Sequence, residues 1–185
     1  MKNAVVVGLG AISPQHIDGI LKAATLYGVC DIIKEKADEI ATLHHCKAFY
    51  SIEDVVKDET VDSVHICTPH YLHLEMAVLC SENGKEIVLE KPAVMNLEEF
   101  DRLSKLLEKN NTRHMVVLQN RYNPCMQFLA KNDLTLGKLI GMKGILTWHR
   151  SEEYYKTSNW RGTYKTEGGG LLINQAPHTL DLISY

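Results

Sequence analysis

The sequence lacks the features that mark several large classes of protein. It has no block of basic residues and carries a formal net charge of −3, so a nucleic acid is not an expected partner. No apolar run approaches the length of a membrane span. Residues 1–3 lead directly into a predicted strand, which leaves no room for a signal peptide. We therefore expect a cytoplasmic protein without a membrane partner.

The sequence also lacks any C-x-x-C pair among its five cysteines. Several of these cysteines lie in apolar segments, which favours reduced, packed thiols over disulfides. His44, His45 and Cys46 form a group of possible metal ligands. Adjacent residues rarely converge on one ion, and no partner cluster follows them, so we predict no metal site.

Short apolar runs alternate with helical patterns from residue 1 to about residue 119, and 45% of all residues are apolar, enough for a core. The predicted strands lie near residues 4–8, 28–31, 47–50, 63–67, 86–90 and 115–119. The predicted helices lie near residues 13–26, 35–43, 52–57, 72–82 and 97–109. This alternation is typical of an α/β doubly wound parallel sheet, which we assign to a first domain at residues 1–119.

The turn after the first predicted strand carries Gly8 and Gly10 and continues through Ala11 and Ile12 into a helix. In this context the first glycine permits the turn, and the second lets the backbone approach a pyrophosphate. Free amides at the helix N-terminus would favour the phosphate charge. Ser13 stands where a third glycine is expected, so the turn alone does not identify a nucleotide site.

Asp31 ends the second predicted strand, 23 residues after Gly8. This is close to the spacing expected of the acid that binds an adenosine ribose. Ile32 and Ile33 follow, where an adjacent arginine would suit a 2′-phosphate. The sequence therefore favours NAD over NADP. The alternative is that Asp31 merely starts a turn before the next helix.

Glu90, Lys91 and Pro92 follow the apolar run 87–89, which is typical of a buried parallel strand. The carboxyl ends of such strands face the ligand crevice of open α/β sheets. A dehydrogenase acting on alcohols needs a proton acceptor there, and lysine can serve once its pKa falls from about 10.4 toward 7–8. An X-Pro bond at such a position can be cis. The alternative is a strand-end lysine in an ordinary turn.

The fourth predicted strand ends at another candidate edge of the same crevice. Cys67, Thr68 and Pro69 form this strand end, and His70 and His73 follow at the start of a helix. Either histidine could contact a cofactor or lie on the surface.

The pattern changes after residue 119. A helix is predicted over residues 124–132, and residues 138–150 place alternate apolar side chains on one face, as in a strand of an antiparallel sheet. No second strand of comparable quality follows, and the chain stops at Tyr185 inside an apolar pattern. We expect residues 120–185 to be the start of an α+β C-terminal domain. Either the chain is a fragment, or another chain supplies the missing edge.

Three glycines, residues 168–170, precede a second cluster of polar residues. If a helix starts near Asn174, then Asn174, His178 and Asp181 share one of its faces. Pro177 is tolerable only in a first helical turn, which supports a helix start there. A helix N-terminus would favour the neutral, proton-accepting form of His178. The alternative is a polar helix face above a glycine loop.

Taken together, these motifs resemble the glucose–fructose oxidoreductase / inositol dehydrogenase family (Gfo/Idh/MocA) over essentially the whole chain. The matching pieces are Gly8 and Gly10 with His16, Asp31, residues 67–69 with His73, residues 90–92, residues 119–124, Trp160 with Arg161, and residues 168–170 with Asn174, His178 and Asp181. Any one piece is weak, but their joint order is specific.

The resemblance implies an N-terminal Rossmann domain and a C-terminal domain whose large open sheet is often used for oligomerisation. It implies that Lys91 is the catalytic lysine and His178 the catalytic histidine, with Asn174 orienting the substrate. The residues expected to bind the cofactor are Gly8, Gly10, Ala11, Ile12, Asp31, Cys67, Thr68, Pro69, His73, Glu90, Lys91, Asn120, Trp160 and Arg161. Family chains are longer than this one.

Asn174 stands where the family often has aspartate. Asparagine can orient a hydroxyl, but it cannot accept a proton. We expect an NAD(H)-dependent oxidoreductase acting on a secondary alcohol of a sugar, sugar derivative or cyclitol, with homo-oligomers forming through the C-terminal sheet. The alternative is a non-catalytic nucleotide-binding regulator or a remnant of such an enzyme.

Overall fold

The chain forms two compact units, Met1–Val116 and Val117–Tyr185, which are described separately. The computed structural model describes residues 1–131, 138, 140–156 and 158–185. The division of the chain into two functional domains after residue 119 stays a prediction.

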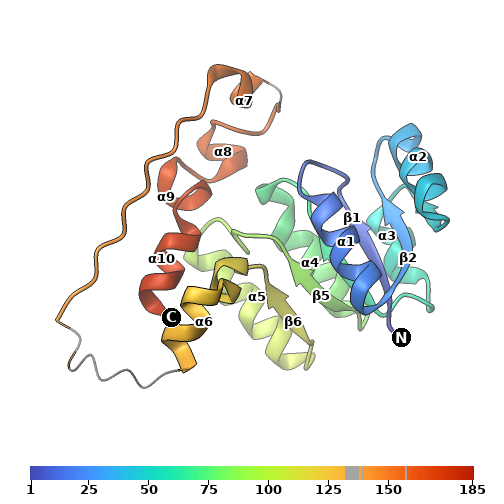
Figure 1. Cartoon of the computed structure of the whole chain (residues 1–185). Helices are drawn as coiled ribbons and strands as arrows, with labels where there is room; N and C mark the ends of the chain where they lie inside the picture. Colours follow the sequence, from blue (N-terminus) through green and yellow to red (C-terminus); the bar gives the residue numbers. More distant parts are fainter. Residues whose placement is uncertain (132–137, 139, 157) are drawn as a thin grey trace. The chain divides into compact units, whose positions relative to one another are not determined.

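The first unit is built on a six-stranded sheet in the order β3-β2-β1-β4-β5-β6 (Figure 1). All five strand pairings are parallel. The strands are β1 (Asn3–Val7), β2 (Thr25–Cys30), β3 (Lys47–Phe49), β4 (Ser63–Ile66), β5 (Glu86–Leu89) and β6 (His114–Val116). The order reverses between β1 and β4, which is where doubly wound sheets bind ligands. The predicted fold class is confirmed for this unit.

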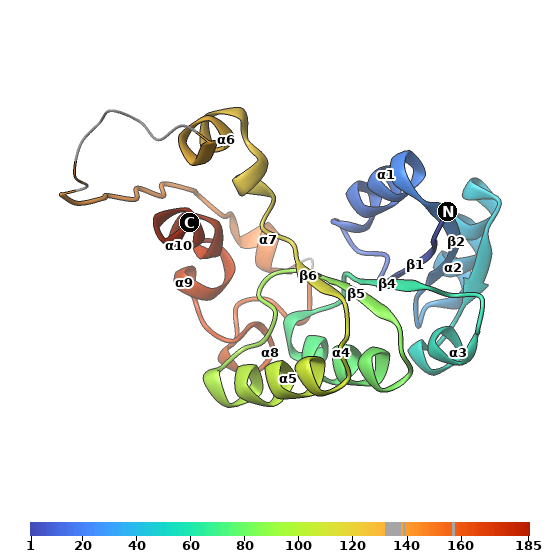
Figure 2. The same ribbon diagram turned by 90° about the horizontal axis from the view of Figure 1, so that it is seen from below.

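Helices cover both faces of the sheet (Figure 2). They are α1 (Ser13–Ala23), α2 (Lys34–His44), α3 (Ile52–Lys57), η1 (His70–Leu72), α4 (His73–Glu82) and α5 (Leu97–Lys109). Alternate residues of β1 enter two separate cores: Val5 and Val7 pack with α3, α4 and α5, whereas Ala4 and Val6 pack with α1 and α2. A strand buried on both faces is continuously apolar, as residues 4–7 of β1 are.

Helix bounds agree with the sequence where a capping side chain fixes them. Ser51 accepts a hydrogen bond from the Asp54 amide and begins α3, and Asn96 accepts one from Glu99 and begins α5. Both helices have their predicted bounds. The predicted end of the first helix at residue 26 is wrong, because β2 already begins at Thr25. Gly28 lies inside β2, where an added Cβ would lie 2.6 Å from the Phe49 ring.

The second unit is helical in the part that the structure describes. Its elements are η2 (Gln119–Tyr122), α6 (Pro124–Lys131), α7 (Glu152–Lys156), α8 (Tyr164–Glu167), α9 (Leu171–Asn174) and α10 (Pro177–Ser184). The strand predicted over residues 138–150 is wrong for residues 140–150, which carry no strand assignment, while residue 139 lies outside the described residues. A strand forms only when its backbone is hydrogen-bonded to a neighbouring strand. The alternating pattern indicates which side chains would share one face, and it does not supply that neighbour.

Several general features of the chain bear on its chemistry. No helix in the described ranges is long and apolar enough to cross a membrane. All five cysteines are free thiols. Burial raises the pKa of Cys30 and of Cys80 to about 12, which keeps both thiols protonated and unreactive at neutral pH. Across the described residues, no group of three or more His, Cys, Asp and Glu side chains could hold a metal ion.

Candidate functional site

The glycine turn lies between the end of β1 and the start of α1. Gly8 has a φ of +89°, and an added Cβ would lie 2.8 Å from Thr68 Cγ2 and 2.9 Å from the Cys67 carbonyl carbon. Only glycine combines this backbone with so close an approach. At Gly10, by contrast, an added Cβ would meet no atom within 4 Å. The turn is therefore tight against β4 at Gly8 and open at Gly10, where Ala11 and Ile12 lead into α1.

Asp31 follows β2 and is joined to this turn. Its Oδ2 accepts a hydrogen bond of 2.9 Å from the Leu9 amide, and its Oδ1 accepts one of 3.0 Å from the Ile33 amide. The Lys36 ammonium lies 3.8 Å from Oδ2. A carboxylate has about four acceptor positions, so these contacts leave acceptor capacity for a ribose diol. The hydrogen bond from Leu9 to Asp31 could not be predicted from the sequence.

Glu90 lies at the end of β5 and belongs to a buried network. Its Oε1 lies 3.1 Å from His16 Nε2, and His16 Nδ1 lies 3.0 Å from His65 Nδ1. A carboxylate only accepts, so His16 Nε2 carries the proton of the first contact. Burial, followed by the charge of His16, lowers the pKa of His65 to about 4, so His65 is neutral at pH 7. His65, on β4, was not singled out in the sequence.

Lys91 follows Glu90 directly and is half-buried. Its backbone amide donates a 3.1 Å hydrogen bond to Glu90 Oε2, and the Lys91-Pro92 bond is cis, as the sequence allowed. The Glu90 carboxylate thus connects His16 on α1 with the backbone of Lys91. This arrangement fixes the backbone from which the lysine side chain extends.

His73, the first residue of α4, is completely buried. Its Nδ1 lies 2.7 Å from the Pro92 carbonyl oxygen, and its Nε2 lies 2.8 Å from the Thr68 carbonyl oxygen. Burial lowers the pKa of His73, while the two carbonyl contacts act in the opposite direction. The ring thus joins the segment that follows β4 to the segment that follows β5.

The strand end at Cys67, Thr68 and Pro69 contributes backbone more than reactive groups. The Cys67 amide donates to the Val7 carbonyl at 2.8 Å. Burial and the charge of Glu90 raise the pKa of the Cys67 thiol, so it is not a nucleophile. The structure therefore brings the first-unit candidates together at the ends of β1, β2, β4 and β5.

The remaining candidates lie in the second unit. Asn120 is part of η2. The Arg161 guanidinium lies 4.4 Å from the centre of the Tyr154 ring and 5.1 Å from that of Trp160. Arg150 lies 4.6 Å from the same Tyr154 ring. Trp160 and Arg161 are thus neighbours in a stack of cations and aromatic rings.

The prediction that Asn174, His178 and Asp181 share one helix is wrong. Asn174 is the last residue of α9, and α10 begins at Pro177. Proline has no amide hydrogen to continue α9, so the chain ends one helix and starts another. The prediction that Pro177 marks a helix start is confirmed, and His178 is the second residue of α10. Asp181 forms a two-point ion pair with Arg121.

Glu167 was missed in the sequence, although an acidic residue directly before three glycines was a visible signal. Its side chain is buried, accepts a 2.6 Å hydrogen bond from the Gly162 amide and accepts another from the Asn174 side-chain amide. Gly168 and Gly169 follow with φ of +90° and +145°. The glycines therefore provide backbone that other residues rarely adopt.

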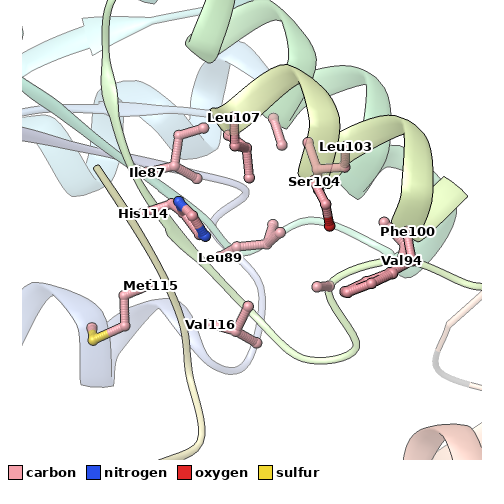
Figure 3. Close-up of a pocket in the computed structure, with 12 residues that line it drawn as sticks. Ile87, Leu89, Val94, Phe100, Leu103, Ser104, Leu107, His114, Met115 and Val116 are labelled. Carbon is pink, nitrogen blue, oxygen red and sulfur yellow. The ribbon is translucent and has the colours of Figure 1, made fainter. Parts of the chain in front are cut away.

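A separate pocket lies between α5 and the edge of the sheet (Figure 3). Its walls are mostly apolar and include Ile87, Leu89, Leu103 and Leu107. None of the predicted site residues lines it, and it lacks the converging polar groups expected of a nucleotide site. We attribute this pocket to the packing of α5 against the sheet.

The residues of the first unit fit a dinucleotide. Gly10 leaves room for a pyrophosphate, α1 starts beside it, and Asp31 offers carboxylate oxygens at the end of β2. A family model described as "Oxidoreductase family, NAD-binding Rossmann fold" (GFO_IDH_MocA) matches residues 2–118.

Similar proteins are longer than this chain. The 4-carboxy-2-hydroxymuconate-6-semialdehyde dehydrogenase of Sphingobium sp. is 28% identical over 97% of this chain and 57% of its own length. The NAD(+)-dependent scyllo-inositol 2-dehydrogenase of Bacillus subtilis is 29% identical over 97% of this chain and 52% of its own length. The WlbA dehydrogenase of Chromobacterium violaceum, solved with NADH and UDP-GlcNAcA, has a TM-score of 0.92 and 30% identity over 99% of this chain and 54% of that one. The chain thus spans about half the length of these relatives.

Proposed function

The chain belongs to this oxidoreductase family and its residues 2–118 form an NAD-binding Rossmann domain, and we propose that it serves an NAD(H)-dependent dehydrogenase acting on a secondary alcohol. The observation that carries the proposal is the placement of Lys91. It follows β5, next to the reversal of strand order, with its backbone amide held by Glu90. A proton acceptor at this edge suits alcohol oxidation.

The proposed division of labour follows from the side chains. Lys91 takes the hydroxyl proton of the substrate, while the C–H hydrogen leaves with its electron pair as hydride. A nicotinamide cofactor would supply the hydride acceptor, or the donor in the reverse direction. His178 acts as a second acid–base group, and Asn174 orients the substrate.

The cofactor preference is proposed to be NAD. Asp31 offers acceptor oxygens that suit a ribose diol and would repel a 2′-phosphate. The two residues after it, Ile32 and Ile33, are exposed and uncharged. Trp160, Arg161 and Asn120 are also proposed to contact this cofactor.

The proposed substrate is a sugar, sugar derivative or cyclitol. The support comes from the names of the relatives, one of which acts on an inositol and one of which was solved with a nucleotide sugar acid. A third relative is named for a semialdehyde, so a screen should include an aldehyde. We also propose a cytoplasmic location, which agrees with the five free thiols.

Self-association is proposed through residues 140–150. Ile140, Ile145 and Trp148 of this segment are each more than half exposed. Three exposed large apolar side chains within one short segment support an interaction surface there. Light scattering should report a species larger than the monomer, and a monomer at high concentration would contradict the proposal.

The test of the catalytic proposal compares Lys91→Met with Lys105→Met, an exposed lysine on α5. NADH formation would be followed with scyllo-inositol, UDP-GlcNAcA and an aldehyde. We expect Lys91→Met to lower turnover by about 10²–10⁴-fold, because proton transfer contributes this much. The Lys105 variant should match the wild type. Tight NADH binding without turnover of any substrate would favour the alternative, a non-catalytic nucleotide-binding regulator.

A further inference from the structure

The few residues of the second unit that are buried in its described part are mainly polar. Glu167, Asn174 and Gln175 are buried beside the apolar Ala176. Glu167 is 2% exposed, the least of the four. A buried carboxylate is costly unless hydrogen bonds satisfy it, so its partners indicate why it is retained.

The backbone around Glu167 holds its carboxylate in one place. Thr163 caps α8 by accepting a hydrogen bond from the Thr166 amide, and Glu167 donates its own amide to the Thr163 carbonyl at 3.0 Å. Its Oε2 accepts from the Gly162 amide at 2.6 Å. The side chain therefore closes the loop that carries it, and Oε1 is directed at Asn174.

This contact decides the orientation of the Asn174 amide. A carboxylate only accepts hydrogen bonds, so the atom of Asn174 that faces Glu167 must be the amino nitrogen. The carbonyl oxygen of Asn174 then points away from Glu167. An asparagine without such a partner can present either its donor or its acceptor after rotating by half a turn.

We propose that Glu167 is the positioning residue for Asn174: it holds the amino group of Asn174 and turns the carbonyl oxygen of that side chain toward the substrate. The inference rests on the proposed function, in which Asn174 meets the substrate. It adds that the group bound at Asn174 is a hydrogen-bond donor, as an alcohol hydroxyl is. Asn174 carries no negative charge itself, but the Glu167 carboxylate that accepts its hydrogen bond does.

A charge exchange between the two positions tests the pair. In N174D two carboxylates face each other. In E167Q the single carbonyl oxygen of the carboxamide cannot take the place of both carboxylate oxygens that accept from Gly162 and Asn174, so the orientation of the Asn174 amide is no longer fixed. In E167Q/N174D a carboxamide again meets a carboxylate. The control is Glu153→Gln, an exposed glutamate of α7. Trp148 and Trp160, the two tryptophans of the chain, both lie in the second unit, so their fluorescence follows its unfolding.

The stability measurement has a definite expected pattern. N174D should lower the unfolding midpoint by about 4–8 °C, E167Q by less, and the double variant should recover most of the loss of N174D. Additive losses in the double variant would overturn the pairing. As a spectroscopic check, the side-chain amide signals of Asn174 should shift in E167Q and stay unchanged in the Glu153 variant.

The kinetic measurement tests the direction of the carbonyl oxygen. With a substrate from the screen, E167Q should raise KM about 5–10-fold with a smaller change in kcat, the size of one hydrogen bond. The double variant should restore KM, because the carboxylate at position 174 still offers an oxygen. If the two substitutions have coupled effects on stability but KM does not change, the proposed contact between Asn174 and the substrate is wrong. If the wild type also showed no turnover, the proposed function and the substrate contact would fail together, while the stability cycle would still decide the pairing.

Discussion

The two units bury different kinds of side chain. The first unit has an apolar core on each face of its sheet, with Val5, Val64 and Ile66 completely excluded from solvent. The described part of the second unit buries a polar set around Glu167, while Leu172 and Ile183 stay exposed. Apolar burial stabilises a fold without regard to direction, whereas buried polar groups fix particular atoms in place. The first unit thus combines an apolar scaffold with single buried polar groups such as His16, His73 and Glu90, whereas the described part of the second unit buries mainly polar side chains.

The largest expected effect separates the two units by stability. Ile66→Ala in β4 should cost about 2–5 kcal/mol of unfolding free energy, because it leaves a cavity in a packed core. Ile183→Ala in α10, where the side chain is 42% exposed, should cost less than about 1 kcal/mol. Hydrogen exchange resolved by peptide would assign each loss to its unit. Equal losses would contradict the contrast between them.

A second comparison lies within the glycine turn. Gly10→Ala should leave stability unchanged, because its Cβ meets no protein atom, yet weaken NADH binding about 10-fold or more if the pyrophosphate passes there. Gly8→Ala should weaken binding and also destabilise the fold by about 1–3 kcal/mol, because of its positive φ and its contact with Thr68. Calorimetric titration and thermal unfolding would separate the two effects. Unchanged NADH affinity in Gly10→Ala would remove the pyrophosphate from this turn.

A third prediction concerns pH. The pKa of His65 is about 4 in the folded chain and 6.5 ordinarily, so between these pH values the unfolded chain binds a proton on His65 that the folded chain does not bind. The stability of the fold is therefore full above pH 6.5. It falls by about 2–3 kcal/mol as the pH falls toward 4. His65→Asn should flatten the stability of the first unit over this window. His149→Asn, an exposed site in the second unit, should not.

The smallest expected effect compares two ion pairs. Arg121→Gln in the second unit should lower the stability measurably, because the Asp181 side chain is only 11% exposed and loses its guanidinium partner. Arg102→Gln on the first unit should change the stability less, since Arg102 and Glu75 are both mostly exposed. Urea unfolding would measure both. A larger cost at Arg102 would reverse the ranking.

The first unit could be predicted from sequence because its signals are local. Continuous apolar strands such as β1, and capping residues such as Ser51 and Asn96, fix the elements without knowledge of distant partners. The parallel order then brings Gly8 and Asp31 to one edge. The contacts among His16, His65 and Glu90 could not be predicted, because they join residues far apart in the sequence.

The second unit was less predictable for a physical reason. The alternation over residues 140–150 indicated a strand, but pairing depends on a neighbour that the described residues do not include. Spacing alone placed Asn174 on the helix of His178, whereas Pro177 separates them. The contact of Glu167 with Asn174 depends on the loop that Thr163 closes, which no spacing rule describes.

The most direct test of the central claim is a calorimetric titration of NADH and NADPH into this chain and into its Asp31→Asn variant, with Asp18→Asn as an exposed control. We predict that NADH binds at least about 10-fold more tightly than NADPH and that Asp31→Asn narrows this difference, because Asp31 favours a ribose diol over a 2′-phosphate. Equal affinities in the wild type, or no binding of either nucleotide, would contradict the account.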